Sequence, residues 1–235
     1  MNTNSSIKQE QFFKILDKRL AEMGKTLDPM QYIVSDELKL VYYVNSKVAC
    51  SSIKATFLND PTADDYSVHK AVIREGIYHY HLTEEQASYF SFSFVRNPLS
   101  RLVSCYESKY HIDPLKFNLR DYDQFLFGYM SEDEGFDTFV RKVCALPVRL
   151  MDRHFRPQYD LFYDDNGICH CDYIGHFETL EEDFEPIRTR FGLRPLPHLN
   201  RSKEVDWHSY YTDETLELVR KTYKKDFEAF GYDNT

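Results

Sequence analysis

The sequence predicts an α/β fold, a single domain in which a central parallel sheet is flanked by helices. Two strand-to-helix transitions support this prediction. In residues 40–57, a β-branched and aromatic stretch is followed by small residues and then by apolar residues at helical spacing. In residues 89–110, an aromatic-rich strand pattern ends at Arg-Asn-Pro and an amphipathic helix pattern follows. Strands that alternate with helices in this way are typical of parallel sheets.

The composition allows one sizeable core and disfavours several functions. The chain has 235 residues, of which 42% are hydrophobic. Its net charge of −9 argues against general nucleic-acid binding. The five cysteines are scattered and odd in number, as expected for reduced thiols in a cytosol. Because the N-terminus lacks the apolar segment of a signal peptide and no apolar run reaches transmembrane length, we expect a cytoplasmic protein without an integral membrane segment.

Further elements are predicted in the N-terminal half. Residues 7–23 have the pattern of a docked amphipathic helix, and residues 32–34 predict a short strand. Residues 67–75 predict another helix. Thr83 and Gln86 fit a capping box at the start of a brief helix. The apolar stripe expected for the first helix comprises Phe13, Leu16, Leu20 and Met23.

The C-terminal half predicts a third strand and three helices. The strand is expected over residues 173–176, and helices are expected over residues 136–143, 180–191 and 212–230. Pro186 lies inside the second of these helical patterns, where it should kink or shorten the helix.

Residues 45–52 predict an anion site between the first strand and its helix. Small side chains over residues 48–50 let backbone N–H groups approach a phosphate, and a helix N-terminus adds about half a positive charge. Lys47 adds a full charge, and the hydroxyls of Ser51 and Ser52 can donate to oxygens. The loop is neither a Walker A motif nor a dinucleotide fingerprint, because it contains no glycine. An ordinary exposed strand-to-helix turn is the structural alternative.

A second anionic group is expected at the end of the next strand. Arg96 ends that strand, and Ser104 lies about two turns into the following helix. In an open α/β sheet, ligands bind beyond the carboxyl ends of the strands. The planar guanidinium of arginine suits phosphate, to which it can donate bidentately.

Four stretches resemble the motifs of one enzyme family, in the family's order, and together they span residues 40–230. They are Ser46-Lys47-Val48-Ala49-Cys50-Ser51-Ser52; Phe94-Val95-Arg96-Asn97-Pro98 with Arg101-Leu102-Val103-Ser104 and Tyr106; His154-Phe155-Arg156-Pro157-Gln158 with Asp172-Tyr173-Ile174-Gly175 and Glu178-Thr179-Leu180; and Asn200-Arg201-Ser202. On these residues the chain resembles the membrane-associated carbohydrate sulfotransferases, the group that includes chondroitin 4-sulfotransferase and heparan sulfate 2-O-sulfotransferase. The first stretch is similar to the family's 5′-phosphosulfate loop and the second to its 3′-phosphate motif.

The sequence departs from this family in three respects. Ser46 stands where the loop usually has proline, and Ile53 stands where many members have an aromatic residue. Eukaryotic members also carry an N-terminal membrane anchor, so the chain resembles a bacterial cytosolic member or a member whose anchor has been removed.

The resemblance implies a P-loop NTPase-like sulfotransferase fold that uses PAPS (3′-phosphoadenosine 5′-phosphosulfate) as the sulfate donor and needs no metal. Lys47 would neutralise charge on the bridging oxygen. Arg96 and Ser104 would hold the 3′-phosphate, and Arg201 and Ser202 would close over the nucleotide. The whole cofactor-binding set is Lys47, Val48, Ala49, Cys50, Ser51, Ser52, Ile53, Arg96, Ser104, Arg201 and Ser202. Sulfuryl transfer is an in-line displacement by an acceptor hydroxyl, so positioning and charge stabilisation must supply most of the catalysis.

The acceptor hydroxyl needs a base, and a histidine is expected because imidazole titrates near neutral pH. Tyr78-His79-Tyr80-His81 is similar to a Y-H-x-H sequence of heparan sulfate 2-O-sulfotransferase, in which the second histidine is regarded as the base. The resemblance therefore implies His81 as the base and His79 as its neighbour. His154 is the alternative base. A surface or hydrogen-bonded structural role is the alternative for each of these histidines.

The expected acceptor is a carbohydrate hydroxyl. Arg149, Arg153 and Arg156 are candidates to bind an acidic sugar, with a solvated or ion-paired face as the structural alternative. A small-molecule or protein hydroxyl as acceptor, and a non-catalytic nucleotide-binding module, remain open. A P-loop kinase is disfavoured because the Gly-Lys-Ser/Thr loop and an acidic metal ligand are both absent from their expected places. Zinc is disfavoured at Cys169-His170-Cys171 because the C-x-C spacing lacks the usual gap and no second pair follows.

We expect one sulfotransferase domain over residues 1–235. Its segments are an N-terminal helix and lead-in (1–38), a PAPS-binding core (40–110), an acceptor-side segment (111–172), and a C-terminal strand with helices (173–235).

Overall fold

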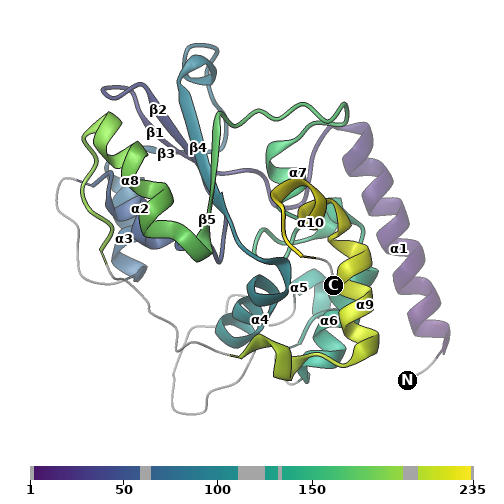
Figure 1. Ribbon diagram of the computed structural model, residues 1–235. Helices are drawn as coiled ribbons and strands as arrows, with labels where there is room; N and C mark the ends of the chain where they lie inside the picture. Colours follow the sequence, from purple (N-terminus) through teal and green to yellow (C-terminus); the bar gives the residue numbers. More distant parts are fainter. Residues whose placement is uncertain (1–2, 59–64, 111–124, 132–133, 198–205, 234–235) are drawn as a thin grey trace. The chain divides into compact units, whose positions relative to one another are not determined.

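The computed structural model describes residues 3–58, 65–110, 125–131, 134–197 and 206–233 (Figure 1). The chain forms two compact units. Unit 1 comprises Met1–Pro29, Pro98–Pro157 and Trp207–Thr235, and unit 2 comprises Met30–Asn97 and Gln158–Asp206. The division of residues 1–235 into functional segments of one domain stays a prediction.

Unit 2 contains a mixed sheet whose strands have the order β3-β1-β2-β4-β5. Three neighbouring strands are parallel, as predicted: β2 (Leu40–Tyr43), β4 (Phe90–Val95) and β5 (Tyr173–His176). β1 (Tyr32–Ser35) is antiparallel to β2, and β3 (Tyr78–His79) is antiparallel to β1. The α/β class is therefore confirmed. The β3 strand is an addition to the predicted elements, because two residues are too few to show a strand pattern.

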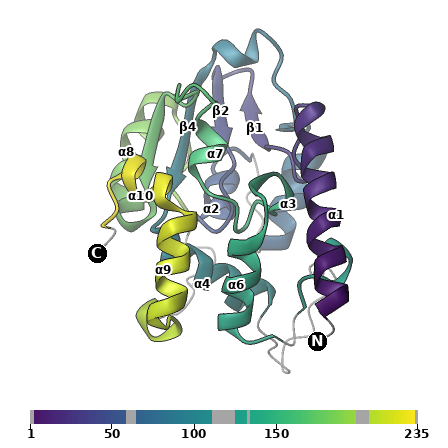
Figure 2. The same cartoon turned by 90° about the vertical axis from the view of Figure 1, so that its right-hand side faces the viewer.

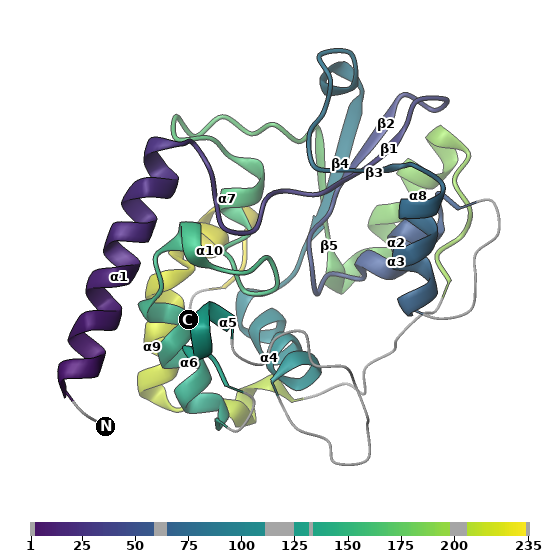
Figure 3. The same ribbon diagram turned by 180° about the vertical axis from the view of Figure 1, so that it is seen from behind.

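Three helices cover one face of this sheet, as Figures 1 and 3 show. They are α2 (Cys50–Ala55), α3 (Asp65–Arg74) and α8 (Leu180–Phe191). The core between helices and sheet includes Ile33, Tyr42, Ile53, Val68, Phe92, Phe94, Phe184 and Ile187. Unit 2 also has the short helix α7 (Tyr159–Phe162) and the 3-10 turns η1 (Gln86–Ser88) and η3 (Phe177–Thr179).

Local sequence signals explain several of these elements. The capping box before η1 is confirmed, because Gln86 N donates to Thr83 Oγ1 at 3.2 Å and Thr83 N donates to Gln86 Oε1 at 3.1 Å. In β5, a Cβ on Gly175 would lie 2.5 Å from Cε1 of Phe94, so close packing of two strands requires glycine there.

Two helices differ from their predicted form. α2 already begins at Cys50, because Ala49 with φ 49° marks the end of the loop, and it ends at Ala55. The hydroxyl of Thr56 donates to the carbonyl of Ile53 at 2.7 Å and satisfies part of this helix end. α8 continues past Pro186 to Phe191, so the proline does not shorten the helix.

Unit 1 is helical. Its helices are α1 (Thr3–Glu22), α4 (Pro98–Lys109), α5 (Phe125–Gly128), α6 (Phe136–Ala145), α9 (Asp213–Thr222) and α10 (Lys224–Phe230), with 3-10 turns η2 (Val148–Leu150) and η4 (Trp207–Tyr210). Helices α6 and α9 lie side by side (Figure 2). The core of unit 1 is largely aromatic and aliphatic and includes Phe13, Leu102, Phe139, Phe155, Val219 and Phe227.

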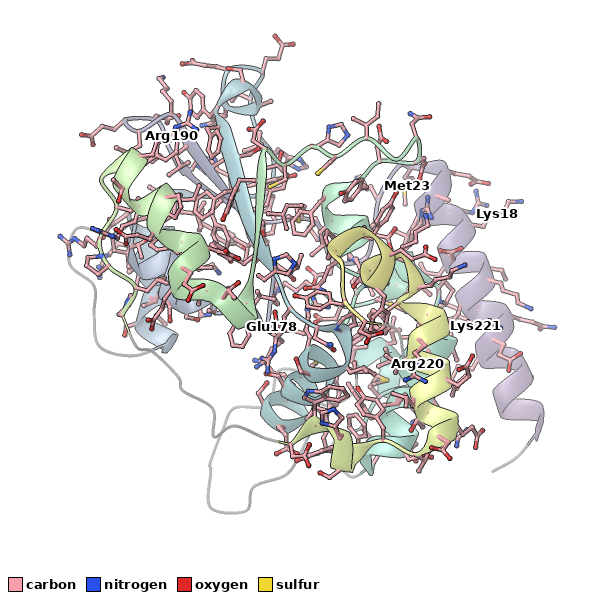
Figure 4. All side chains as sticks on the ribbon, in the orientation of Figure 1. Lys18, Met23, Glu178, Arg190, Arg220 and Lys221 are labelled. Carbon is pink, nitrogen blue, oxygen red and sulfur yellow. The ribbon has the colours of Figure 1, made fainter. Side chains whose placement is uncertain are left out.

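Two predictions for unit 1 are corrected. The helix expected over residues 212–230 is broken at Tyr223, whose buried hydroxyl donates to the carbonyl of Phe155. Met23 is not part of the buried stripe of α1, because the helix ends at Glu22 and the Met23 side chain is exposed (Figure 4). Within the described residues, no helix combines the length and apolar character needed to cross a membrane.

Candidate functional site

The loop between β2 and α2 has two non-glycine residues in the left-handed conformation. Lys47 has φ 68° and Ala49 has φ 49°. Such angles cost roughly 1–2 kcal/mol each, so the surrounding structure must hold them. Ala49 is followed directly by Cys50, the first helical residue, and adjacent left- and right-handed residues are an arrangement in which successive N–H groups can bind an anion. The fully buried side chain of Val48 anchors the loop in the core of unit 2. The backbone therefore fits the predicted anion site.

A buried pair of side-chain amides, which we call the amide brace, joins the start of this loop to the end of β4. Nδ2 of Asn45 donates to the carbonyl of Phe94 at 2.9 Å and to Oε1 of Gln158 at 2.9 Å. Oε1 of Gln158 also accepts from the backbone N–H of Arg96 at 3.0 Å, and Nε2 donates to the Arg96 carbonyl at 2.8 Å. Both amide side chains are completely buried. The brace fixes Arg96 relative to the residues just before the Lys47 loop.

Arg96 is held at the carboxyl end of β4, next to the loop that follows β2. Its Nη1 donates to the carbonyl of Lys47 at 3.3 Å, and its guanidinium carbon lies 4.3 Å from the centre of the Phe177 ring. Glu178 follows β5 and is labelled in Figure 4. Its Oε1 accepts from the backbone N–H of Asn97 at 2.9 Å. The structure therefore brings the predicted loop and the predicted arginine together, as expected for neighbouring parallel strands.

Ser51 of α2 has a partner that the sequence did not reveal. Ser51 and Ser52 are mostly buried, and Oγ of Ser51 lies 3.4 Å from Nε2 of His69 in α3. Nδ1 of the same ring lies 3.2 Å from Nζ of Lys54, another buried residue of α2. Ser51 and Lys54 are three residues apart, so the sequence alone could have placed them on the same face of a helix. No local pattern could have predicted that His69 contacts them. Ile53 is fully buried and serves the core.

The two histidines proposed around the catalytic base, His79 and His81, lie at the end of the outer strand β3 and just beyond it. Because β3 is antiparallel to β1 and β1 is antiparallel to β2, β3 runs in the direction of β2. His79 is paired with Tyr32, which is paired with Tyr43 at the end of β2. Two strand spacings, about 10 Å, separate β3 from β2. His81 is exposed where the chain leaves β3. Both histidines therefore belong to the sheet edge at which the Lys47 loop begins.

The alternative base, His154, lies in unit 1 beside Asp152. Its Nδ1 is 2.5 Å from Oδ1 of Asp152, and the two side chains are only 13% and 9% exposed. Burial lowers the pKa of His154 to about 4, despite the attraction of the carboxylate. Burial also opposes ionisation of Asp152, but the charge and hydrogen bonds of His154 hold the pKa of that carboxyl at about 2. At neutral pH the carboxylate thus accepts from Nδ1–H of a neutral imidazole.

Because His154 is buried in its neutral form, we expect the protein to lose stability in acid. An unfolded histidine takes up its proton near pH 6.5, whereas folded His154 stays neutral down to about pH 4. Between these values the unfolded chain binds more protons, so the free energy of unfolding falls as the pH is lowered, by roughly 2–3 kcal/mol from this group. Urea unfolding of wild type and His154→Gln at pH 7 and pH 4.5 measures the effect. The change in the free energy of unfolding between the two pH values should be smaller in His154→Gln than in wild type. It should be unchanged in His208→Gln, which removes an exposed imidazole of unit 1. Equal changes in wild type and His154→Gln would contradict this assignment.

The three arginines predicted to bind the acceptor are not equivalent. Arg156 is buried, and its guanidinium donates to the carbonyls of Asp28 and Met151. This position favours a structural role, so we leave Arg156 out of the proposed acceptor contacts. Arg153 is partly exposed and ion-paired with Asp28 at 3.6 Å. Arg149 is half-buried.

Helix α4 carries Arg101 and Ser104, two of the polar residues of the second resemblance motif. The side chain of Arg101 is buried and donates to the carbonyls of Arg153 at 2.7 Å and Arg156 at 2.8 Å, and burial lowers its pKa. Arg101 therefore holds the segment that contains His154. Ser104 is half-buried on the same helix of unit 1. Its contact with the 3′-phosphate stays a prediction, as do the roles of Arg201 and Ser202, which lie outside the described residues.

In the part of the chain that the structure describes, no group of three or more His, Cys, Asp or Glu side chains is arranged to hold a metal ion. At the C-x-C stretch, Sγ of Cys169 donates to the carbonyl of Cys171 at 3.4 Å. The expectation that the chemistry needs no metal stays a prediction.

Several curated proteins resemble the chain. Carbohydrate sulfotransferase 14 of Danio rerio is 30% identical over 239 residues, which cover 88% of this chain and 63% of that protein. Carbohydrate sulfotransferase 14 of Homo sapiens is 26% identical over 239 residues, covering 85% and 59%. Carbohydrate sulfotransferase 10 of Xenopus laevis is 27% identical over 173 residues, covering 63% and 49%. The chain thus spans less than two thirds of the length of these relatives. No solved structure matches the chain.

A family-level match covers most of the chain. Residues 30–233 match the Sulfotransferase family. The matched range includes the Lys47 loop, the amide brace, Arg96 and the histidine candidates. This chain belongs to the sulfotransferase family.

Proposed function

We propose that the chain is a sulfotransferase that moves the sulfuryl group of PAPS to a hydroxyl of a carbohydrate. One observation carries the proposal: the Lys47 loop and Arg96 are fixed together at the ends of adjacent parallel strands, through the amide brace and the Arg96–Lys47 contact. Family membership supports the reaction class. The names of the relatives, which are carbohydrate sulfotransferases, support a carbohydrate acceptor for this chain.

The residues of the loop fit the 5′ end of such a donor. The left-handed Ala49 next to the helical Cys50 is an arrangement in which successive N–H groups can bind an anion, and Lys47 places a full positive charge in the same loop. PAPS supplies the sulfuryl group, and its 3′,5′-bisphosphate is the product that leaves. Lys47 is the residue that would stabilise charge developing at the bridging oxygen, and Arg96 would bind a phosphate through its planar fork.

His81 is the base that we propose. The strand register supports it, because β3 runs in the direction of β2 and ends at the level of Tyr43, where the Lys47 loop starts. A neutral imidazole there can accept the proton of the acceptor hydroxyl. His154 is the second candidate, because its bond to Asp152 orients a neutral ring.

The acceptor side is proposed in outline. Arg149 and Arg153 are the arginines that we assign to an acidic sugar, and their positive charge would favour a carboxylated or sulfated carbohydrate. A phenolic small molecule or protein tyrosine is the alternative acceptor. A panel of polysaccharides, oligosaccharides and phenols, tested with radiolabelled PAPS, separates these alternatives.

Replacement of His81 by alanine is expected to lower turnover by roughly 10²- to 10⁴-fold, because the acceptor hydroxyl loses its base. Affinity for 3′,5′-adenosine bisphosphate (PAP), measured by calorimetry, should stay within about twofold of wild type, because no phosphate contact is lost. His154→Ala, measured in parallel, distinguishes the two candidate bases. Full turnover in His81→Ala with loss in His154→Ala would transfer the role to His154, and PAP binding without turnover in wild type would favour a non-catalytic module.

A further inference from the structure

A chain of polar contacts ends at the hydroxyl of Ser51, which is predicted to bind phosphate. Helices α2 and α3 pack against each other, and His69 of α3 lies between two α2 side chains that are one helical turn apart. Its Nε2 is 3.4 Å from Oγ of Ser51, and its Nδ1 is 3.2 Å from Nζ of Lys54. Lys54 is only 2% exposed, and its Nζ also lies 5.8 Å from the centre of the Tyr78 ring. A lysine that is buried to this degree is rare in proteins, because removing its charge from water is costly.

The chemistry of the three groups gives these contacts a direction. A protonated lysine has three donors and no acceptor, so with Lys54 in its charged form Nδ1 of His69 accepts from Lys54. A neutral imidazole that accepts at Nδ1 carries its proton at Nε2. The Nε2–H of His69 therefore donates to Oγ of Ser51. Because that oxygen already accepts from the ring, the hydroxyl proton of Ser51 is directed to a different acceptor.

We propose that Lys54 and His69 are positioning residues that orient the Ser51 hydroxyl to donate to the 5′-phosphate of the sulfate donor. This inference rests on the proposed function, in which the Lys47 loop holds the 5′ end of PAPS. Lys54 fixes the tautomer of His69, and His69 fixes the rotation of the Ser51 hydroxyl. A pre-oriented donor loses less rotational freedom when it binds a charged oxygen, so the hydrogen bond contributes more to affinity. The structural alternative is that the three groups only pack α2 against α3.

A double-mutant cycle between His69 and Ser51 tests the contacts from Lys54 through His69 to Ser51, which we call the relay. The two ligands are PAP, which has the 5′-phosphate, and 3′-AMP, which lacks it. His69→Leu should lower the affinity for PAP by roughly five- to tenfold, which lies within the range of one typical protein hydrogen bond, because the bond to phosphate is weakened rather than removed. Its affinity for 3′-AMP should stay unchanged. In the Ser51→Ala background, His69→Leu should change the affinity for PAP by less than about twofold, because the residue through which it acts has gone.

Two further variants separate orientation from packing. Gln at position 69 can accept from Lys54 and donate to Ser51, so His69→Gln should recover most of the PAP affinity that His69→Leu loses. His170→Leu is the matched control, because it makes the same replacement at an exposed histidine of unit 2 and should leave both affinities unchanged. Melting temperatures of all variants identify any that fail to fold, in which case the Gln and Ser51→Ala arms carry the test.

The outcomes separate the relay from the proposed function. If His69→Leu lowers the affinities for PAP and 3′-AMP equally, or if its effect is undiminished in the Ser51→Ala background, the relay is wrong and the packing alternative holds. If the wild-type protein does not bind PAP more tightly than 3′-AMP, the assignment of the Lys47 loop to the 5′-phosphate fails, and the relay fails with it.

Discussion

Replacement of Lys47 by alanine is expected to lower turnover by roughly 10²- to 10³-fold, the usual effect of removing one group that stabilises charge in a transition state. Lys47 lies in the loop between β2 and α2, where its ammonium is the proposed partner of the bridging oxygen. That oxygen gains charge only as the bond to sulfur breaks, so ground-state binding of PAP should weaken by less than about tenfold. Turnover with radiolabelled PAPS and calorimetry with PAP measure the two quantities.

Lys39 provides a matched control for this substitution. It is also a lysine in the left-handed conformation, with φ 50°, but it precedes β2 and therefore lies at the opposite end of that strand. Its ammonium pairs with Glu85 at 2.9 Å. Lys39→Ala should leave turnover within about twofold of wild type, because an exposed ion pair contributes little. Equal losses of turnover in Lys39→Ala and Lys47→Ala would contradict the role of Lys47.

Replacement of Gln158 by alanine is expected to destabilise the protein by roughly 3–5 kcal/mol, because it removes three hydrogen bonds in a completely buried site and leaves a cavity. The backbone N–H and carbonyl of Arg96 would both lose their side-chain partner. Arg96 would then be less well positioned, and the affinity for PAP should fall as well. Urea unfolding and calorimetry on the same variant measure both effects.

Gln31 is the control for the loss of a buried glutamine. Its side chain is 5% exposed, and among the described residues its Nε2 has no hydrogen-bond partner. Gln31→Ala removes the same atoms without breaking a network, so its cost should be well below that of Gln158→Ala and PAP affinity should not change. If the two variants lost the same stability, the amide brace would not have the role that we assign to it.

The parts of the site that could be predicted are those encoded locally. Strand patterns ending at Asn45 and Arg96, followed by helical patterns, indicate two parallel strand ends side by side. Lys47, followed by mostly small residues, indicates an anion-binding loop, and this pattern is also local in sequence. The structure confirms that this loop and Arg96 lie together.

The remaining parts depend on contacts between residues distant in sequence. Gln158 and Asn45 are joined only by the folded sheet edge, and a glutamine in isolation gives no sign that it will be buried. His69 likewise gains its place from the packing of α3 on α2. Arg156 carries a charge that predicts a ligand contact, but its guanidinium is taken up by backbone carbonyls inside unit 1.

The limits of a helix can also depend on tertiary contacts, and such limits were predicted wrongly from the sequence. The apolar spacing over residues 212–230 continues across Tyr223, so periodicity alone predicts one helix. In the structure, Tyr223 adopts φ −102° and ψ 20°, outside the helical range, while its hydroxyl reaches the carbonyl of Phe155. A tertiary hydrogen bond thus accompanies a break that local pattern does not encode.

The Lys47 loop and Arg96 are proposed to form a site for a nucleotide with both 5′- and 3′-phosphates. Calorimetric titration of the protein with PAP, beside ATP with Mg²⁺ and 5′-AMP, tests this proposal. We expect selective binding of PAP, weakened by about 30-fold or more in Arg96→Ala because a charged bidentate contact is lost. Absence of PAP binding, or a preference for ATP with Mg²⁺, would contradict the assignment of the loop.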